Sequence, residues 1–186
     1  QEGLSFVNSE MTDDIKFSSG GFEAVYGDKM SSVLDIKYKS PDSNQYRINT
    51  SFLGGSFTSE NVSKDKSISN ILGLRYRDNS LLVNSKETNS NFKPSFFDLQ
   101  NHLRLSINAR LSISTLTNFS LNRYNFKPLN RQTNFGTLDD PRALIIFYDG
   151  EEKDRYATFF NSISVDYKPN QRDTYTINSS FYNTTE

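Results

Sequence analysis

Residues 97–113 have the sequence FDLQNHLRLSINARLSI, in which apolar and polar side chains alternate. Eight of the nine odd-numbered positions are apolar, and none of the eight even-numbered positions is. A helical i, i+4 face would leave Phe97, Leu105 and Ile113 unexplained, so the period of two predicts β-strand rather than helix. Because the stretch is long for one strand, we expect a hairpin turn at residues 108–110.

The same alternation recurs in four other segments, at residues 46–52, 68–76, 157–167 and 175–181. Two apolar residues, Ile71 and Phe160, break it by falling on the polar side. Only 34% of the residues are apolar while 13% are aromatic, which suits strands that are apolar on one face only. The sequence therefore predicts an all-β fold of antiparallel strands.

The connections between these segments alternate in length. Short ones are expected near residues 61–66, 108–110 and 169–172, and long ones near residues 78–94 and 127–154. Outer-membrane β-barrels have this asymmetry, with tight turns at one end of the sheet and excursions at the other. A chain that enters at the short-turn end must cross the sheet twice before its first short turn, so one more reversal is needed on the long-loop side. Gly54-Gly55 is the expected tight turn there.

Aromatic residues gather near both ends of the expected strands. Tyr46, Tyr167 and Tyr175 lie beside short turns, and Tyr76, Phe97, Tyr124 and Tyr156 lie beside long loops. A tilted strand from Tyr156 to Tyr167 would rise roughly 26 Å, close to the ~25 Å apolar band between the two aromatic girdles of a membrane barrel. Cross-strand aromatic pairs inside a soluble sandwich are the alternative interpretation.

A different kind of sequence precedes the alternating region. Residues 17–27 read FSSGGFEAVYG and residues 31–38 read SSVLDIKY, the second of which predicts a short strand from Val33. These two pieces, in this order, resemble the C-terminal end of the plug domain of TonB-dependent outer-membrane receptors. Residues 97–100, 122–128, 131–137 and 147–151 also look like strand and loop sequences of that family.

The resemblance implies a large transmembrane β-barrel of 22 strands, of which about seven would lie here, preceded by the end of a plug. Residues 1–43 would be the C-terminal end of the plug and the plug-barrel junction, and residues 44–186 the N-terminal barrel strands. The expected junction residues are Gly20, Gly21, Tyr26, Gly27, Val33 and Asp35. The family's TonB box and closing strand are not visible, so an internal piece of a longer receptor is expected.

The same resemblance implies a function. The whole protein would sit in the bacterial outer membrane, bind a nutrient such as a metal chelate, a glycan or a peptide, and import it by energy-coupled plug movement. Its expected partners are outer-membrane lipid, the rest of the receptor chain, the TonB energy-coupling complex and, as a further candidate, a surface lipoprotein.

Composition excludes several other classes of protein. The 21 Lys and Arg against 22 Asp and Glu leave no basic surface for nucleic acid, and the absence of Cys removes disulfides and thiolate metal sites. The longest apolar run, residues 143–148, is far shorter than the roughly 20 residues of a spanning helix. No catalytic arrangement is evident, so neither an enzyme nor a cofactor is expected, and the lone His102 predicts a polar lining residue rather than a metal ligand.

The outer loop of residues 139–155 carries six acidic residues. Their spacing matches no compact calcium loop, so a solvated loop is the favoured interpretation and no metal site is expected. Arg142, Phe147 and Tyr148 in this loop are candidates for contact with a ligand, because arginine and aromatic side chains make good recognition surfaces.

Two other functional classes stay open. One is a soluble, secreted β-sandwich that binds carbohydrate or acts as an adhesin. The other is a barrel that does not transport and serves as a scaffold for surface partners.

Overall fold

The computed structural model describes residues 6–21, 23–27, 31–80, 90–137 and 139–186. The fold is all-β and every strand pair is antiparallel. The strands are β1 (Thr12–Ser18), β2 (Val33–Tyr38), β3 (Gln45–Ser51), β4 (Gly54–Val62), β5 (Ile68–Asp78), β6 (Ser90–Asn108), β7 (Leu111–Pro128), β8 (Arg131–Gly136), β9 (Pro141–Ile146), β10 (Glu152–Tyr167) and β11 (Tyr175–Thr185). A 3-10 turn, η1 (Ala24–Tyr26), lies between β1 and β2.

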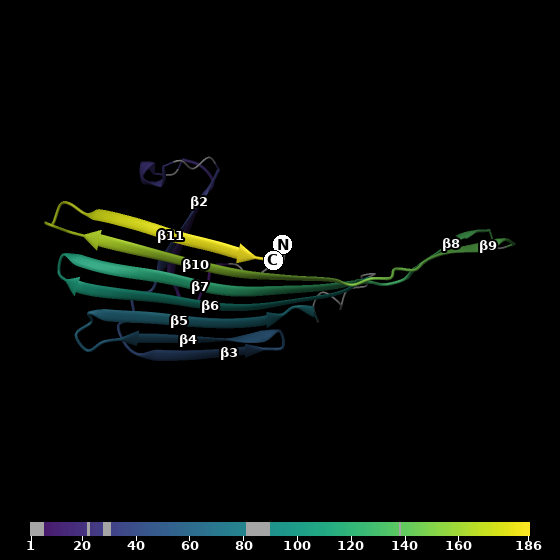
Figure 1. Cartoon of the computed structure of the whole chain (residues 1–186), viewed down its shortest axis with the longest axis horizontal. Coiled ribbons are helices and arrows are strands. Elements are labelled where there is room, and N and C mark those ends of the chain that lie inside the picture. The colour runs from purple at the N-terminus through teal and green to yellow at the C-terminus, as the bar shows by residue number, and fades with distance from the viewer. Residues whose placement is uncertain (1–5, 22, 28–30, 81–89, 138) are drawn as a thin grey trace.

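Seven strands form one curved sheet in the order β11-β10-β7-β6-β5-β4-β3 (Figure 1). Each strand lies beside its neighbour in sequence, apart from the β8–β9 hairpin inserted between β7 and β10. The predicted antiparallel strands are therefore confirmed. The sheet is open: within the described residues it does not close into a barrel, and β3 and β11 each have one unpaired edge.

The predicted hairpin at residues 108–110 is confirmed between β6 and β7. The side chain of Asn108 fixes it, because Oδ1 accepts hydrogen bonds from the backbone N–H groups of Arg110 and Leu111 at 2.8 and 2.9 Å. Asparagine suits such turns because its carboxamide can replace a backbone acceptor.

Two predicted connections differ in detail. The reversal between β3 and β4 is made by Phe52 and Leu53, and Gly54 is already the first residue of β4. Its φ of 140° favours glycine, and a Cβ there would collide with the Tyr76 carbonyl oxygen. β6 begins at Ser90 instead of after Pro94, since the ring of Phe92 packs against Tyr124 and extends the pairing with β7.

The long connection expected near residues 127–154 is also more regular than predicted. β7 continues to Pro128, β10 begins at Glu152, and the intervening chain forms the β8–β9 hairpin, which projects far beyond the sheet (Figure 1). All residues of both short strands are exposed.

The pairing register gives the seven-stranded sheet two distinct faces. The first, called the polar face, carries the row Arg47, Thr58, Gly73, Gln100, Asn118, Phe160 and Tyr182. The second, called the apolar face, carries the adjacent row Ile48, Phe57, Leu74, Leu99, Phe119, Phe159 and Asn183. Paired residues share a face because side chains alternate along each strand.

Burial on these faces is the reverse of that in a sheet of a water-soluble protein. On the polar face, Thr58, Gln100 and Asn118 are at most 2% exposed. On the apolar face, Ile48 is 74% exposed and Phe159 is 41% exposed. In β6, the even-numbered polar-face positions from Pro94 to Gln100 are buried, whereas the intervening apolar-face positions are only partly buried.

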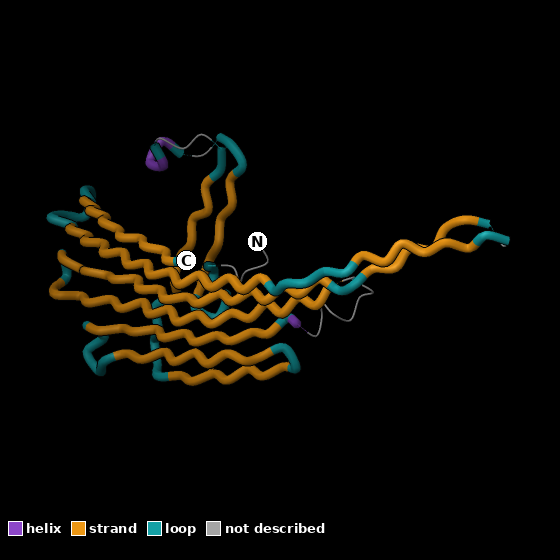
Figure 2. Tube along the Cα trace, turned by 45° about the vertical axis from the view of Figure 1, so that its right-hand side comes forward, coloured by secondary structure: helices purple, strands orange, loops and turns teal. Residues whose placement is uncertain are grey.

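The predicted strand at Val33–Tyr38 is confirmed as β2, which pairs with β1 in a separate two-stranded sheet. This hairpin stands up from the large sheet, with η1 near its far end (Figure 2). Among the described residues, no helix is long and apolar enough to cross a membrane.

Candidate functional site: the polar face and the N-terminal strap

Residues 6–11, here called the N-terminal strap, lie against the polar face. Two side chains of the sheet bind the strap backbone: Gln100 Nε2 donates to the Phe6 carbonyl oxygen at 2.7 Å, and Arg75 Nη1 donates to that of Val7 at 3.0 Å. The ring of Phe6 meets Phe160 edge-on with 5.4 Å between centroids. The sheet therefore holds the strap both through its backbone carbonyl groups and through packing of its side chains.

A missing side chain on β5 makes room for the strap. Gly73 faces Met11 and Asn8, which are 0% and 1% exposed. A Cβ at Gly73 would lie 2.5 Å from Met11 Sδ and 2.6 Å from Asn8 Nδ2, well inside van der Waals contact. The φ of Gly73 is not positive, so the backbone conformation does not require glycine here. The close approach of the strap does.

A buried ion pair orients the arginine that binds the strap. Arg75 Nη2 lies 3.0 Å from Asp98 Oδ1, and their side chains are 14% and 5% exposed. Asn118 Nδ2 donates to the second carboxylate oxygen, Asp98 Oδ2, at 2.7 Å. With both oxygens engaged, the carboxylate is fixed and the guanidinium is aimed at the Val7 carbonyl group.

The end of β2 returns to the same face. Lys39 donates its backbone N–H to the Met11 carbonyl oxygen at 2.9 Å and its Nζ to that of Glu10 at 2.7 Å. The Tyr38 ring stacks on His102 with 4.9 Å between centroids and 22° between planes. Burial, followed by the nearby Asp98 carboxylate, raises the pKa of the Tyr38 hydroxyl to about 12, so it stays neutral.

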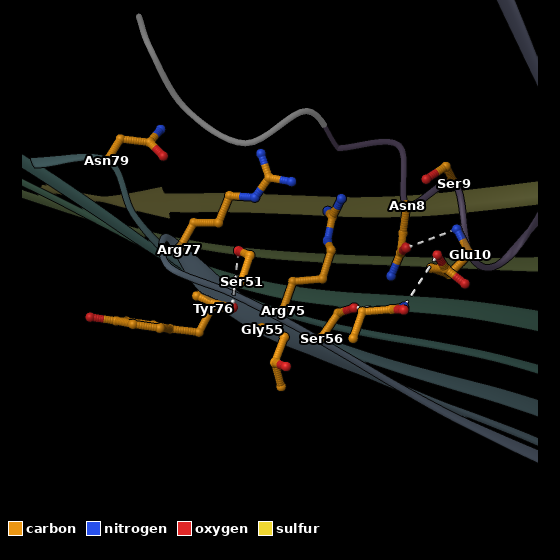
Figure 3. A pocket seen from close by; sticks show the side chains of 13 residues that line it. Asn8, Ser9, Glu10, Ser51, Gly55, Ser56, Arg75, Tyr76, Arg77 and Asn79 are labelled. Atoms are coloured by element: carbon orange, nitrogen blue, oxygen red, sulfur yellow. Dashed lines mark hydrogen bonds between the residues drawn. The ribbon is translucent and has the colours of Figure 1, made fainter. Parts of the chain in front are cut away.

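Cavities flank the strap on both sides. One, of about 510 Å³, lies over β3–β5 and is lined by polar groups that include Asn8, Arg75 and Arg77 (Figure 3). The other, of about 530 Å³, lies over β6, β7, β10 and β11 between Phe6 and Tyr182. The first cavity reaches the β3–β4 turn and the end of β5, which is the end of the sheet that carries the longer connections.

The six predicted junction residues, Gly20, Gly21, Tyr26, Gly27, Val33 and Asp35, belong to the β1–β2 hairpin end that points away from the large sheet (Figure 2). Two are brought together: Tyr26 Oη donates to Asp35 Oδ2 at 2.8 Å, and this bond raises the pKa of Tyr26. Val33 is buried and pairs with Ser18. The contacts with the large sheet described above come from the strap and from Tyr38, and Lys39 binds the strap.

The predicted ligand contacts Arg142, Phe147 and Tyr148 lie on or just after the β8–β9 hairpin, away from both cavities. Arg142 Nη2 pairs with Asp140 Oδ2 at 2.7 Å, and Phe147 is 75% exposed. The backbone N–H of Tyr148 donates to Asn130 Oδ1 at 3.0 Å. The structure thus does not bring these three residues into one site.

The acidic loop and His102 show no metal centre. Within the described ranges, no three His, Asp or Glu side chains gather closely enough to hold an ion. Two of the loop carboxylates pair with neighbouring cations: Asp140 with Arg142, and Glu151 with Lys153 at 2.8 Å. His102 lies on the polar face against Tyr38.

Sequence reasoning missed the strap and its receiving residues, although a signal was present. Ile71 and Phe160, the exceptions to the alternation, are polar-face residues; Ile71 is 0% exposed, and Phe160 contacts Phe6. Phe96, another apolar residue at an even position, is 1% exposed. Apolar residues on an otherwise polar face therefore mark buried places on that face.

Comparisons of the chain with protein-family models, with curated proteins and with solved structures found no match.

Proposed function

We propose that this chain forms part of a TonB-dependent outer-membrane receptor, with the seven-stranded sheet as a sector of the barrel wall and residues 1–43, which include the strap, as the C-terminal end of the plug and its junction with the barrel. The observation that carries the proposal is the reversed burial: polar residues are covered on one face and apolar residues are exposed on the other.

The apolar face supports contact with lipid. Its aliphatic and aromatic side chains extend across all seven strands, and Ile48, Phe119, Phe159 and Phe181 are each at least 39% exposed. Soluble monomers rarely expose an apolar surface of this extent. The outer wall of a membrane barrel is apolar by design, with polar residues turned inward along the same strands.

The polar face supports a plugged interior. Arg75 and Gln100 hold the strap through hydrogen bonds to two of its carbonyl groups, which water can replace when the strap leaves, while Met11 and Phe6 add a small packed contact. Such a contact is suited to an element that moves when an energy-coupling partner pulls on it. The receptor would thereby import a nutrient from the cell surface.

The open edges support a larger wall. β11 has no charged residue and no proline, and β3 has one charge, Arg47, so neither edge has the usual protection against further pairing. Inside a bilayer each unpaired backbone group is costly. Further strands that pair with β3 and β11 would satisfy these groups and close the barrel.

Membrane extraction tests the wall. The full-length protein should require detergent for release from the outer-membrane fraction, and it should run faster on a gel before boiling than after it. A folded monomer in plain buffer would contradict the proposal and favour a soluble sandwich, whose apolar faces would have to cover one another.

Cysteine labelling in cells tests the movement of the plug. The chain has no cysteine of its own, so Met11→Cys places one thiol beneath the strap, and Ser9→Cys places a control thiol on its exposed side. A maleimide reagent should label Met11→Cys only while the inner-membrane proton gradient is intact, whereas Ser9→Cys should react with or without it. Equal labelling of Met11→Cys after an ionophore collapses the gradient would contradict energy-coupled movement.

A further inference from the structure

Arg77, in the cavity over β3–β5, is a cation without a partner among the residues that the structure describes. Arg75 and Arg77 lie two residues apart on the polar face and their side chains extend to the same side of the sheet, whereas Tyr76 does not (Figure 3). The charge of Arg75 is offset by Asp98 at 3.0 Å. Among the described residues, Arg77 has neither a salt bridge nor a hydrogen bond, and its side chain is exposed.

A buried donor lines the same cavity. Asn8 is 1% exposed, and its Nδ2 has no acceptor among the described residues. Its Oδ1 accepts a hydrogen bond from the backbone N–H of Glu10 at 3.2 Å, and this bond fixes the orientation of the carboxamide. Nδ2 packs against Gly73 and is closed off from the cavity, so Asn8 forms part of the cavity wall and leaves the recognition of a ligand to Arg77 and the exposed polar groups.

The rest of the lining is hydrophilic, with hydroxyl groups from Ser9, Ser51 and Ser56 and an amide group from Asn79. The one carboxylate, Glu10, lies 4.0 Å from Arg47 and accepts from Asn49 at 3.5 Å, so it is partly offset. The volume of about 510 Å³ falls within the usual range for a small-molecule site, about 300–1,000 Å³.

We propose that this cavity binds a hydroxyl-bearing small molecule that carries an anionic group, with the anion held by the guanidinium of Arg77. The proposal rests on the receptor function above, because in a receptor the cavity would open toward the end of the barrel with the long connections. It narrows the imported nutrient to acidic, polyhydroxylated compounds such as acidic sugars or sugar phosphates.

Calorimetric titration of the full-length protein in detergent tests the inference with three probes. Galacturonate carries a carboxylate on a sugar ring, galactose is its neutral counterpart, and inorganic phosphate is an anion without a ring. Saturable binding of galacturonate, at least about tenfold tighter than that of galactose, is expected, because a charge-assisted hydrogen bond is stronger than a neutral one. Binding of phosphate alone would assign the site to phosphate groups.

Arg77→Gln should weaken binding of the anionic probe about tenfold or more. The matched control is Arg104→Gln, an exposed arginine on the same face near the short turns, which should leave binding unchanged. No saturable binding of either anion, or equal affinity in Arg77→Gln and the parent, would overturn the inference. Heat-modifiable gel mobility of the same samples shows whether the barrel has formed, so failure of this inference is distinguishable from failure of the receptor proposal.

Discussion

At the scale of single residues, Gly73 determines whether the strap can reach the sheet. A methyl group there would meet Met11 Sδ and Asn8 Nδ2 at 2.5 and 2.6 Å, so Gly73→Ala should displace the strap. Overpacking of this kind costs about 1–3 kcal/mol. Hydrogen exchange at the Met11 amide, which is bonded to the Asn8 carbonyl oxygen, should become faster.

The control for this substitution is Gly20→Ala. No atom lies within 4 Å of the position of a Cβ at Gly20, and its φ is not positive. Strap amides should keep their protection in that variant. Unchanged exchange at Met11 in Gly73→Ala would show that the strap does not depend on the space above β5.

The Arg75–Asp98 pair gives a second prediction. Asp98→Ala leaves a mostly buried guanidinium without its carboxylate, which should lower the free energy of unfolding by about 3 kcal/mol. Denaturant unfolding of the protein in detergent measures this. Arg75→Met combined with Asp98→Leu should restore most of the loss, because two apolar residues leave no uncompensated charge.

A suitable control is Asp166→Ala, since Asp166 bonds to Thr176 at an exposed site near the short turns. It should change the unfolding free energy by less than about 1 kcal/mol. Equal losses in Asp98→Ala and Asp166→Ala would mean that the buried pair has no special role.

At the scale of elements, the turn between β4 and β5 is held by an ionised side chain. Ser63 Oγ donates to Asp65 Oδ1 at 2.6 Å, and the backbone N–H of Ser67 donates to the same oxygen at 3.3 Å. These bonds lower the pKa of Asp65 to about 2. Because the folded pKa lies below the unfolded value of about 3.9, the stabilisation is complete above pH 4 and is lost as pH falls toward 2.

Ser63→Ala removes the strongest of these bonds, so the pKa of Asp65 should rise toward its ordinary value. An NMR titration of the Asp65 carboxyl carbon measures the change. Ser43→Ala, which removes a hydroxyl group bonded to Gln45 rather than to Asp65, is the control and should leave the midpoint near 2. An unshifted midpoint in Ser63→Ala would contradict the assigned cause.

Alternation predicted six of the seven strands of the large sheet at least in part, because one consistent environment acts on each face, whereas β4 followed only from the extra reversal expected at Gly54-Gly55. It did not predict β8 and β9. Their region contains the continuous apolar run of residues 143–148, which has no period of two, and both strands are exposed on every residue. Alternation arises where the two faces of a strand meet different surroundings. Both faces of this hairpin are exposed, so its sequence has no reason to alternate.

The candidate site was less predictable than the strands for a physical reason. The carbonyl groups of Phe6 and Val7 bind side chains more than 60 residues away in sequence, Gln100 and Arg75. Local patterns do not encode such pairings. The visible trace of them was the set of apolar residues on the polar side, Ile71, Phe96 and Phe160.

At the scale of the whole molecule, a lysine substitution should affect stability differently on the two faces of the sheet. Ile163 and Ser164 are adjacent in β10, between Tyr156 and Tyr167, and lie on the apolar and polar faces. In a barrel wall, Ile163→Lys would place an ammonium group near the middle of the bilayer. The cost for lysine there is about 2–4 kcal/mol, whereas Ser164→Lys, facing an aqueous interior, should cost less than about 1 kcal/mol.

Unfolding of the full-length protein from lipid vesicles measures both variants under the same conditions. If water rather than lipid covered the apolar face, Ile163→Lys would instead improve solubility without loss of stability, since Ile163 is 44% exposed. Comparing the loss of stability in the two variants therefore shows which face meets lipid and which meets water, because lysine is tolerated only on the face that meets water. A larger loss in Ser164→Lys than in Ile163→Lys would reverse the assignment of the faces and with it the barrel.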